Sequence, residues 1–385
     1  MSTKSLNKLN FFLFVALSTG LTVSACSAEP VNTVSSIEKS DTSQSYQLGL
    51  NYYEGKSIKQ DYTKAFELFQ EAANQGYPQA QFQLGVMYDE SEGVSEDKNK
   101  AEALKWYKKS AKQGLADAQN KIGVKYFYSE DVERNYDKAI KWFKKAAAQG
   151  HPEAQFHLGE YYTNIEGSPI DYNQAIEWYR KSAEQGFYPA EFNLAALYYK
   201  GIGTEPNYSE AFKWYKKVAD KGHAPAQFKV AIMYYEGLGV KQDYKKAFEL
   251  FQTLEDEGYA SAQHNIGAMY EKGEGVKQDY KKAAQWYQKA AEQGYSLSQN
   301  DLGSLYYSGR GVKEDYDKAF ELYTKAAAQG EALAQFNLGE MHYYGDSVSQ
   351  DYNKAYEWYQ KAADQGYQDA QDRIDEMISE GKITR

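Results

Sequence analysis

The chain has 385 residues, and its 44 lysine and arginine residues against 54 aspartate and glutamate residues give a formal net charge of −10. This acidic balance argues against a nucleic-acid-binding protein, because a phosphate backbone requires a basic face. It also argues against attraction to an anionic membrane surface through charge. The single cysteine excludes a disulfide framework and any paired-cysteine metal or redox site.

Residues 1–25 are predicted to be a signal peptide. Lys4 and Lys8 precede an uncharged apolar run at 11–23, and this order is typical of secretory signals. The run is shorter than the about 20 residues that a membrane-spanning helix needs. We therefore expect export of the chain rather than a transmembrane anchor.

The apolar run is followed by Val-Ser-Ala-Cys, ending at Cys26, which resembles the lipobox of bacterial lipoproteins. That resemblance implies acylation of Cys26, and two or more acyl chains suffice for stable anchoring. Ser27 at the next position implies, by the same resemblance, sorting to the outer membrane. The alternative is an ordinary secretory signal that is cleaved nearby, for example after Ala28, with Cys26 incidental.

Residues 26–42 are rich in Ser, Thr and Glu without an apolar period, which predicts a flexible tether. From 43 to 368 the chain repeats, and each of nine units closes with a glycine. These glycines are Gly76, Gly114, Gly150, Gly186, Gly222, Gly258, Gly294, Gly330 and Gly366. Their spacing is 38 once and 36 otherwise, a period that indicates a helical repeat array.

Each unit is predicted to hold two helices. The first carries small-x-x-x-Leu-Gly-x-x-Tyr, as from Ala80, and the second carries Ala-x-x-Trp-Tyr-x-x-Ala-Ala, as from Ala283. Both spacings place apolar residues on one helical face. All six tryptophans share one column of the second helix and are predicted to be core. An Asp or Asn precedes every second helix as a predicted N-cap: Asp61, Asn99, Asn135, Asp171, Asn207, Asp243, Asp279, Asp315 and Asp351.

The segments 237–247 and 273–294, with Gly-x-Gly-Val-Lys-Gln-Asp-Tyr-Lys-Lys-Ala in common, are similar to Sel1-like repeats of the tetratricopeptide-like superfamily. The resemblance implies an all-α fold, an α-solenoid that winds as a right-handed superhelix of nine helix-turn-helix repeats. Residues 369–385 supply one further helix with many charges, which suits a C-terminal capping helix.

The first helix of each unit also has a second stripe of residues, distinct from the stripe that is predicted to pack in the core. By resemblance to tetratricopeptide superhelices, it lines a concave groove that binds a protein partner. The predicted partner-binding residues on it are Phe192, Tyr199, Phe228, Ile232, Tyr235, Tyr307 and Tyr343. Glu160 and Glu271 on the same stripe favour a partner segment with basic and apolar side chains. The alternative is that the phenylalanines pack within their own repeat.

No catalytic, metal or cofactor site is predicted. The Gly-x-Gly segments join two helices, whereas nucleotide-binding fingerprints need a strand before the loop. The five histidines lack ligand-like spacing. Some Sel1-like proteins of the Helicobacter cysteine-rich family are labelled β-lactamases or penicillin-binding proteins, but Ser-x-x-Lys occurs here without its companion motifs.

The sequence therefore predicts a non-catalytic interaction scaffold or adaptor, anchored by its N-terminal lipid in the bacterial outer membrane and facing the periplasm. The alternative is a secreted or surface effector that binds a host protein. A hydrolase is the distant third.

Overall fold

We describe the protein from a computed structural model, which defines residues 37–56, 58–93, 99–128, 133–164 and 170–383. Cys26 and the predicted signal peptide lie outside these residues, as does most of the predicted tether. The first helix begins at Ile37, within the segment that the sequence assigns to the tether. Within the described ranges, no helix combines the length and the apolar character needed to cross a bilayer.

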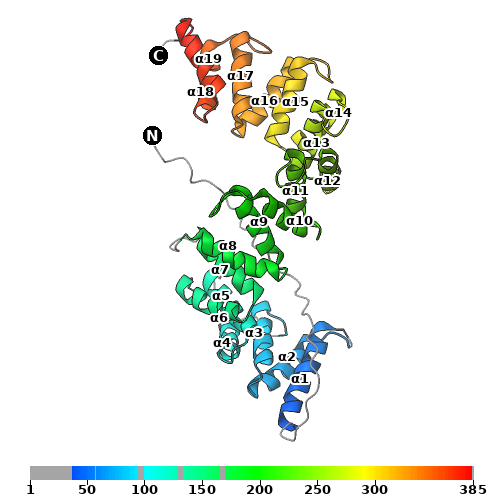
Figure 1. The fold of residues 1–385 in the computed structure, drawn as a ribbon, viewed down its shortest axis with the longest axis vertical. Coiled ribbons are helices and arrows are strands. Elements are labelled where there is room, and N and C mark those ends of the chain that lie inside the picture. The colour runs from blue at the N-terminus through cyan, green and yellow to red at the C-terminus, as the bar shows by residue number, and fades with distance from the viewer. Residues whose placement is uncertain (1–36, 57, 94–98, 129–132, 165–169, 384–385) are drawn as a thin grey trace. The chain divides into compact units, whose positions relative to one another are not determined.

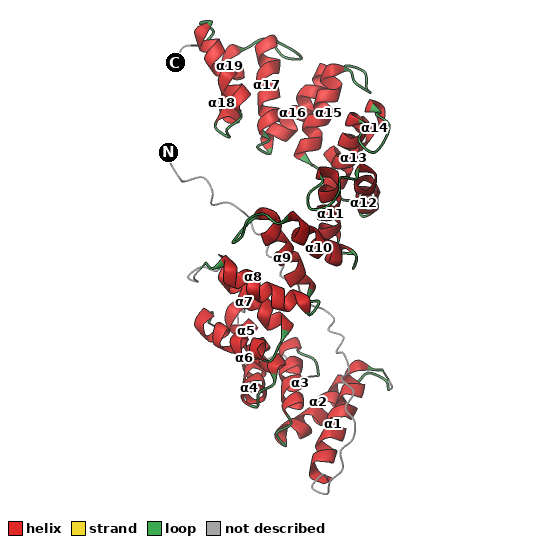
Figure 2. Ribbon diagram, in the orientation of Figure 1, coloured by secondary structure: helices red, strands yellow, loops and turns green. Residues whose placement is uncertain are grey.

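The described residues form nineteen helices and no strand (Figure 1, Figure 2). The helices are α1 (Ile37–Glu54), α2 (Tyr62–Asn74), α3 (Pro78–Glu90), α4 (Asn99–Lys112), α5 (Ala116–Tyr128), α6 (Tyr136–Ala148), α7 (Pro152–Asn164), α8 (Tyr172–Glu184), α9 (Tyr188–Lys200), α10 (Tyr208–Ala219), α11 (Ala224–Glu236), α12 (Tyr244–Asp256), α13 (Ala260–Lys272), α14 (Tyr280–Glu292), α15 (Ser296–Ser308), α16 (Tyr316–Ala328), α17 (Ala332–Tyr344), α18 (Tyr352–Ala363) and α19 (Gln368–Ser379). The predicted all-α solenoid of helix-turn-helix repeats is confirmed.

The chain divides into two compact parts, one ending at Asn207 and the other beginning at Tyr208. Within each part, every helix packs on the helix that precedes it and on the helix that follows it in the chain. Such neighbour-only packing is expected of a repeat protein, in which no single pair of helices can bury its own core.

Polar caps and left-handed glycines set the ends of the helices. In seven of the described repeats, the predicted N-cap accepts a hydrogen bond from the backbone N–H three residues later. These caps are Asp61, Asn135, Asp171, Asp243, Asp279, Asp315 and Asp351. The nine closing glycines all have positive φ, between 82° for Gly258 and 96° for Gly114. Only glycine adopts this backbone conformation without strain.

The glycine within the first helix makes room for an aromatic ring of the second helix. A Cβ atom at Gly267 would lie 2.7 Å from the ring of Tyr287, and one at Gly123 would lie 2.4 Å from Phe143. Both rings are almost fully buried. Where a repeat has this glycine, it thus fixes how closely the two helices approach; the two repeats with Ala195 and Ala231 have an alanine at the position instead.

A ladder of glutamines joins successive repeats on the described part of the chain. The glutamine before a closing glycine donates from Nε2 to the Oε1 of a glutamine in the first helix of the same repeat, over 2.8 Å in each case. The pairs are Gln113–Gln81, Gln149–Gln119, Gln185–Gln155, Gln293–Gln263, Gln329–Gln299 and Gln365–Gln335. The acceptor glutamine in turn donates to a backbone carbonyl at a helix end, as Gln81 does to Ala73 over 3.1 Å. These bonds satisfy carbonyls that a helix C-terminus leaves open.

The tryptophan column is less deeply buried than the sequence predicts. Trp106 and Trp214 are buried, but Trp142, Trp178, Trp286 and Trp358 are half-buried. A lysine three residues later covers the ring: Lys109 Nζ lies 3.6 Å from the centroid of Trp106, and Lys361 Nζ lies 3.8 Å from that of Trp358. This contact combines ring burial with a cation–π attraction.

Candidate interaction surface

On α11, the predicted interaction stripe and the packed face are distinct. Phe228, Ile232 and Tyr235 are half-buried, whereas Val230 and Met233 on the packed face are buried. On α9, Phe192 and Tyr199 are likewise half-buried. Each of these two first helices therefore keeps a partly exposed apolar stripe after its repeats have packed.

The inner edges of the stripe residues pack against the second helix of their own repeat. The ring of Phe228 lies 5.7 Å from that of Phe251 in α12, and Ile232 packs on the same core cluster. In the last repeat, Phe336 contacts Tyr359 at 5.5 Å in the same way. The alternative that the phenylalanines pack within their repeat is thus supported for their inner edges, and a partner would meet only the remaining edge.

The tyrosines of the stripe are tied to an acidic residue of the next repeat. The hydroxyl of Tyr307 donates to Asp346 Oδ2 over 2.7 Å, and the hydroxyl of Tyr235 donates to Glu274. Burial, reinforced by the neighbouring carboxylate, raises the pKa of both tyrosines. Each tyrosine therefore stays neutral, with a fixed ring that loses little entropy on binding.

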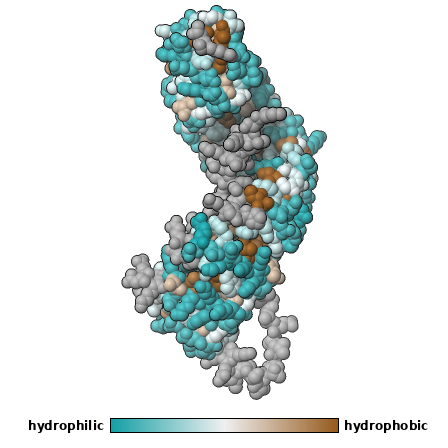
Figure 3. Space-filling view, turned by 90° about the vertical axis from the view of Figure 1, so that its left-hand side faces the viewer, coloured by the Kyte–Doolittle hydropathy of each residue, from teal (hydrophilic) through white to brown (hydrophobic). Residues whose placement is uncertain are grey.

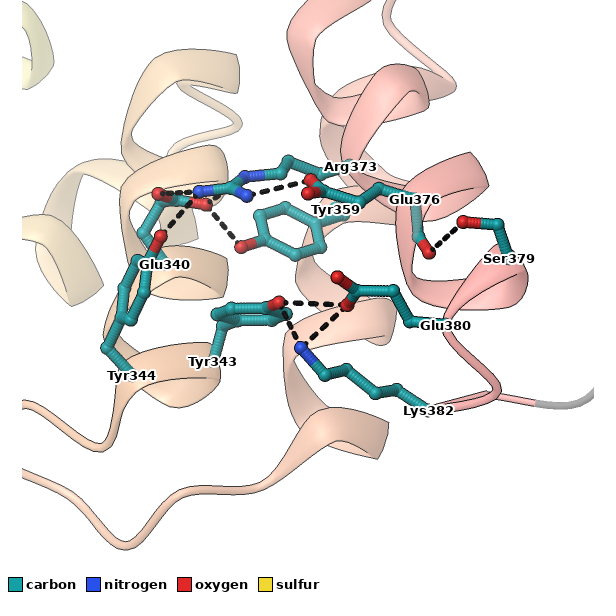
Figure 4. Close-up of polar contacts among 9 residues, drawn as sticks. All are labelled: Glu340, Tyr343, Tyr344, Tyr359, Arg373, Glu376, Ser379, Glu380 and Lys382. Atoms are coloured by element: carbon teal, nitrogen blue, oxygen red, sulfur yellow. Dashed lines mark hydrogen bonds and ion pairs between the residues drawn. The ribbon is translucent and has the colours of Figure 1, made fainter.

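Tyr343 differs from the other tyrosines because the end of the chain covers it. It is 8% exposed, and its hydroxyl contacts Glu380 at 3.3 Å and accepts a hydrogen bond from Lys382 (Figure 4). Arg373 of α19 lies beside it, with its guanidinium 5.3 Å from the ring centroid. Tyr343 consequently offers little surface to a partner.

Arg373 fastens this C-terminal cap to α17. Its guanidinium donates to both carboxylate oxygens of Glu340 over 2.9 Å each, and it also donates to Tyr344 over 2.8 Å (Figure 4). A two-pronged arginine–carboxylate pair of this kind is a strong, directional contact.

A cavity of about 560 Å³ opens on the stripe between α13, α14 and α15, where His264 replaces the usual phenylalanine. Tyr287 donates to Glu271 Oε2 over 2.8 Å, and Arg310 lies 3.6 Å from Glu271 Oε1. Burial, with a smaller contribution from nearby Lys272, lowers the pKa of His264 to about 4. The cavity is therefore polar but holds an uncharged imidazole at neutral pH.

Asp301, which also lines this cavity, carries a carboxyl without a close cationic partner of fixed charge. Burial, aided by Glu271 and Glu331, raises its pKa to about 6. Its nearest basic group is His264, at 3.8 Å. Glu160, by contrast, lies 2.9 Å from His157 Nδ1 and also accepts from Tyr128. Glu271 has Arg310 as its ion-pair partner, so the carboxyl of this cavity that lacks a lysine or arginine partner is that of Asp301.

Sequence reasoning missed Asp301, the cap over Tyr343 and the glutamine ladder. The ladder has a sequence signal, because a glutamine recurs both before the closing glycine and after the small residue of the first helix. Among the residues that the structure defines, no three or more His, Cys, Asp or Glu side chains converge as a metal site would require.

The repeats match the Sel1 repeat family model over residues 45–77, 78–115, 116–151, 152–187, 189–223, 224–259, 260–295, 296–331 and 332–367. Among solved structures, the chain is similar to c5321, a protective antigen of uropathogenic Escherichia coli strains with an SLR fold. The identity is 35%, over 90% of this chain and 82% of c5321, with a TM-score of 0.70. It is also similar to a Sel1 repeat protein from Oxalobacter formigenes, at 31% identity over 81% of this chain and 90% of that protein, with a TM-score of 0.62. A comparison with curated protein sequences gives no match.

Proposed function

Because this chain belongs to the Sel1 repeat family, whose members are commonly protein-interaction scaffolds, we propose that it is a non-catalytic adaptor that binds a partner protein along the stripe of its first helices. The observation that carries the proposal is the set of half-buried aromatic side chains on α11, with an equivalent set on α9. Side chains that a helix holds rigid and partly exposed are typical anchors of an interface.

The charges along the stripe favour a partner segment that alternates apolar and basic side chains. Asp301 and Glu271 line the cavity between α13, α14 and α15, and the raised pKa of Asp301 is the signature of a carboxyl that lacks a cation. An incoming lysine or arginine would supply that cation, while Phe228 and Tyr235 would contact apolar neighbours.

Site-specific photocrosslinking in living cells tests the proposal. A photoreactive phenylalanine analogue at position 199 or 235 is expected to crosslink to one partner protein. The control places the analogue at Lys245, an exposed position of α12 on a second helix. Crosslinks to the same proteins from all three positions, or from position 245 alone, would contradict a role for the stripe.

We further propose that Cys26 carries the lipid that holds the mature chain in the outer membrane, with the repeats facing the periplasm. The support is the sequence pattern alone, namely an uncharged apolar run followed by small residues and the only cysteine of the chain. The tether after Cys26 would give the repeats reach from the membrane.

A second candidate is a surface or secreted protein that binds a host protein. It is favoured by the similarity to c5321, which is a protective antigen of uropathogenic Escherichia coli. Protease treatment of intact cells distinguishes the two candidates. A periplasmic adaptor is expected to resist digestion until the outer membrane is permeabilised, whereas a surface protein is digested at once.

A further inference from the structure

A cavity of about 500 Å³ is lined by residues of α10, α11 and α12. Its walls include Lys216 of α10, Val230 and Tyr234 of α11, and Leu250 and Thr253 of α12. Val230 and Tyr234 lie on a different face of α11 from Phe228 and Ile232, because each is two residues from Ile232, and residues two apart point to different sides of a helix. This cavity is therefore distinct from the interaction stripe, and its volume falls within the range of ligand pockets.

The second helix of this repeat departs from the repeat pattern at three positions around the cavity. Leu250 stands in the tryptophan column, Thr253 stands where all six tryptophan-bearing repeats have the covering lysine, and Glu257 stands in the glutamine column. No other repeat of the sequence combines all three departures. The first two residues line the cavity.

The cavity occupies the place that a tryptophan ring fills in other repeats. Trp286 packs on the cluster that contains Ile266, and Trp358 packs on the cluster that contains Leu338. Ile266 and Leu338 lie at the repeat position of Val230. Since Val230 lines the cavity beside Leu250, the shorter leucine leaves open a space that is large enough to admit an indole ring.

One wall of the cavity carries a hydrogen-bond acceptor without a partner. Gln227 donates from Nε2 to the carbonyl of Ala219 over 3.3 Å, but its buried Oε1 accepts no hydrogen bond. In six other repeats, the glutamine before the closing glycine donates its N–H to the Oε1 at the equivalent of Gln227. In this repeat that glutamine is replaced by Glu257, whose ionised carboxylate cannot donate. A buried acceptor of this kind favours a ligand that brings an N–H group.

The rim of the cavity is charged in a way that suits an aromatic ring. Lys216 and Lys246 both line it, and Lys246 Nζ already lies 5.3 Å from the ring centroid of Tyr234. Elsewhere in the chain a lysine lies 3.6 to 4.4 Å from each of five tryptophan rings. Lys216 Nζ is held by Asp220, 2.7 Å away, and Asp220 and Glu249 also line the cavity. Lys246, whose ion pair with Asp243 is longer at 3.6 Å, is therefore the rim lysine that can make the same cation–π contact with a ring that enters from outside.

We propose that this cavity binds the indole ring of a tryptophan presented by a partner protein. The ring takes the place of the missing repeat tryptophan, its N–H faces Gln227, and its face lies under a rim lysine. Indole fits better than a purely apolar ring because it alone among the apolar aromatic side chains has an N–H donor.

Fluorine NMR of the full chain with N-acetyl-5-fluorotryptophanamide as the probe tests the proposal. We expect saturable binding with a Kd of about 1 mM or tighter, as is typical of a ligand of this size. Leu250→Trp should fill the cavity from within and weaken binding at least about tenfold. Leu322→Trp, the same substitution in the tryptophan column of α16, is the matched control and should leave binding unchanged. Circular dichroism establishes that both variants fold.

A second variant separates the hydrogen bond from the volume of the cavity. Glu257→Gln should give Gln227 its missing donor without filling the space, so probe binding should weaken about threefold. The proposal is overturned if the probe fails to bind at 10 mM (about tenfold above the expected Kd), or if Leu250→Trp binds it as well as the unaltered chain. Binding of zwitterionic tryptophan about tenfold tighter than the amide would also overturn it, because the ligand would then be the free amino acid rather than a protein side chain.

Discussion

At the scale of single residues, the contacts between repeats depend on glutamine side chains that donate and accept in series. Gln293 donates to Gln263 over 2.8 Å, but the equivalent acceptor Gln227 has no donor because position 257 is a glutamate. A buried acceptor left without a partner costs about 1 to 3 kcal/mol. The ladder therefore lacks one hydrogen bond within this repeat, between α11 and the end of α12.

We expect Glu257→Gln to repair this step. The new amide can donate to Gln227 Oε1, so the free energy of unfolding of this region should rise by about 1 kcal/mol. The matched control is Gln293→Glu, which breaks an intact step and should destabilise the chain by a similar or larger amount. Urea unfolding of both variants gives the comparison, and a destabilising effect of Glu257→Gln would contradict the ladder.

His157 is a buried histidine of the first part of the chain, and it lies between two carboxylates. It stacks on Phe143 at 4.8 Å, with Nδ1 2.9 Å from Glu160 and Nε2 3.6 Å from Glu153. Burial alone would lower the pKa of His157, but the two carboxylates outweigh it and raise the pKa to about 9. The imidazolium form therefore stabilises the fold.

The pH dependence of this contribution has a definite sign. The folded pKa lies above the unfolded value of 6.5, so the stabilisation is complete below pH 6.5 and is lost as the pH rises to about 9. We expect urea unfolding to show a loss of up to about 3 kcal/mol between these pH values. His157→Gln, which keeps a donor for Glu160 but cannot titrate, should lack this dependence. An equal slope in both proteins would show that other groups cause it.

At the scale of helices, the tryptophan column joins each second helix to the repeat before it. Trp106 is 6% exposed and packs on the cluster that contains Phe69, Ala73 and Leu84. Its ring therefore links α4 to α2 and α3. Leucine fills the same column at 68, 250 and 322, so the fold accepts a smaller apolar residue at this position.

We expect Trp106→Ala to cost about 3 to 5 kcal/mol, because it leaves a cavity that the helices cannot close. Trp106→Leu, the residue that other repeats use, should cost markedly less. Because each repeat contacts only its neighbours, the loss of hydrogen-exchange protection should begin in α2, α3 and α4. A uniform loss over all the helices would contradict this local picture.

The repeat period predicts most of the helices, because capping and glycine positions are local signals that recur in every unit. Asp243 caps α12, and Gly258 has a φ of 82°, as their spacing indicates. The depth of burial is not a local signal. Trp178 shares the apolar period of a core residue yet is half-buried under Lys181, because the outer side of a second helix has no further layer to cover it.

The sequence predicts which residues lie on the candidate surface, but it does not predict which of them stay exposed, because contacts from outside one repeat decide this. Tyr307 and Tyr343 occupy the same repeat position, but the last repeat is followed by α19 rather than by another repeat. Lys382 and Glu380 then close over Tyr343, and no pattern within one repeat contains that information. The cavity beside Asp301 likewise arises from residues of three different helices.

At the scale of the whole molecule, the face that Figure 3 shows is mostly hydrophilic over the described residues, with apolar residues in separate small patches. Such a surface suits a protein that stays folded in an aqueous compartment and binds partners at defined positions. None of the described helices combines the length and the apolar character needed to span a bilayer.

We expect attachment through Cys26. Cys26→Ser should prevent acylation, so the protein should leave the membrane fraction or accumulate as an unprocessed precursor. Cell fractionation measures release from the membrane, and mass spectrometry of the N-terminus shows whether the precursor has been processed. Metabolic incorporation of a labelled fatty acid tests directly whether the unaltered protein is acylated and the variant is not. If the unaltered protein is already fully soluble in the periplasm, the prediction of a lipid anchor at Cys26 is wrong.

The central claim is that the stripe on the first helices binds a partner protein. The most direct measurement is the Kd of the crosslinked partner for the double variant Tyr199→Ala, Tyr235→Ala. We predict binding at least about thirtyfold weaker, since one anchor truncation often costs about 2 kcal/mol, with the helical circular dichroism unchanged. A control double variant, Tyr188→Ala with Tyr344→Ala, removes two exposed tyrosines outside the stripe and should bind normally. A folded stripe variant that binds its partner as tightly as the unaltered chain would contradict the claim.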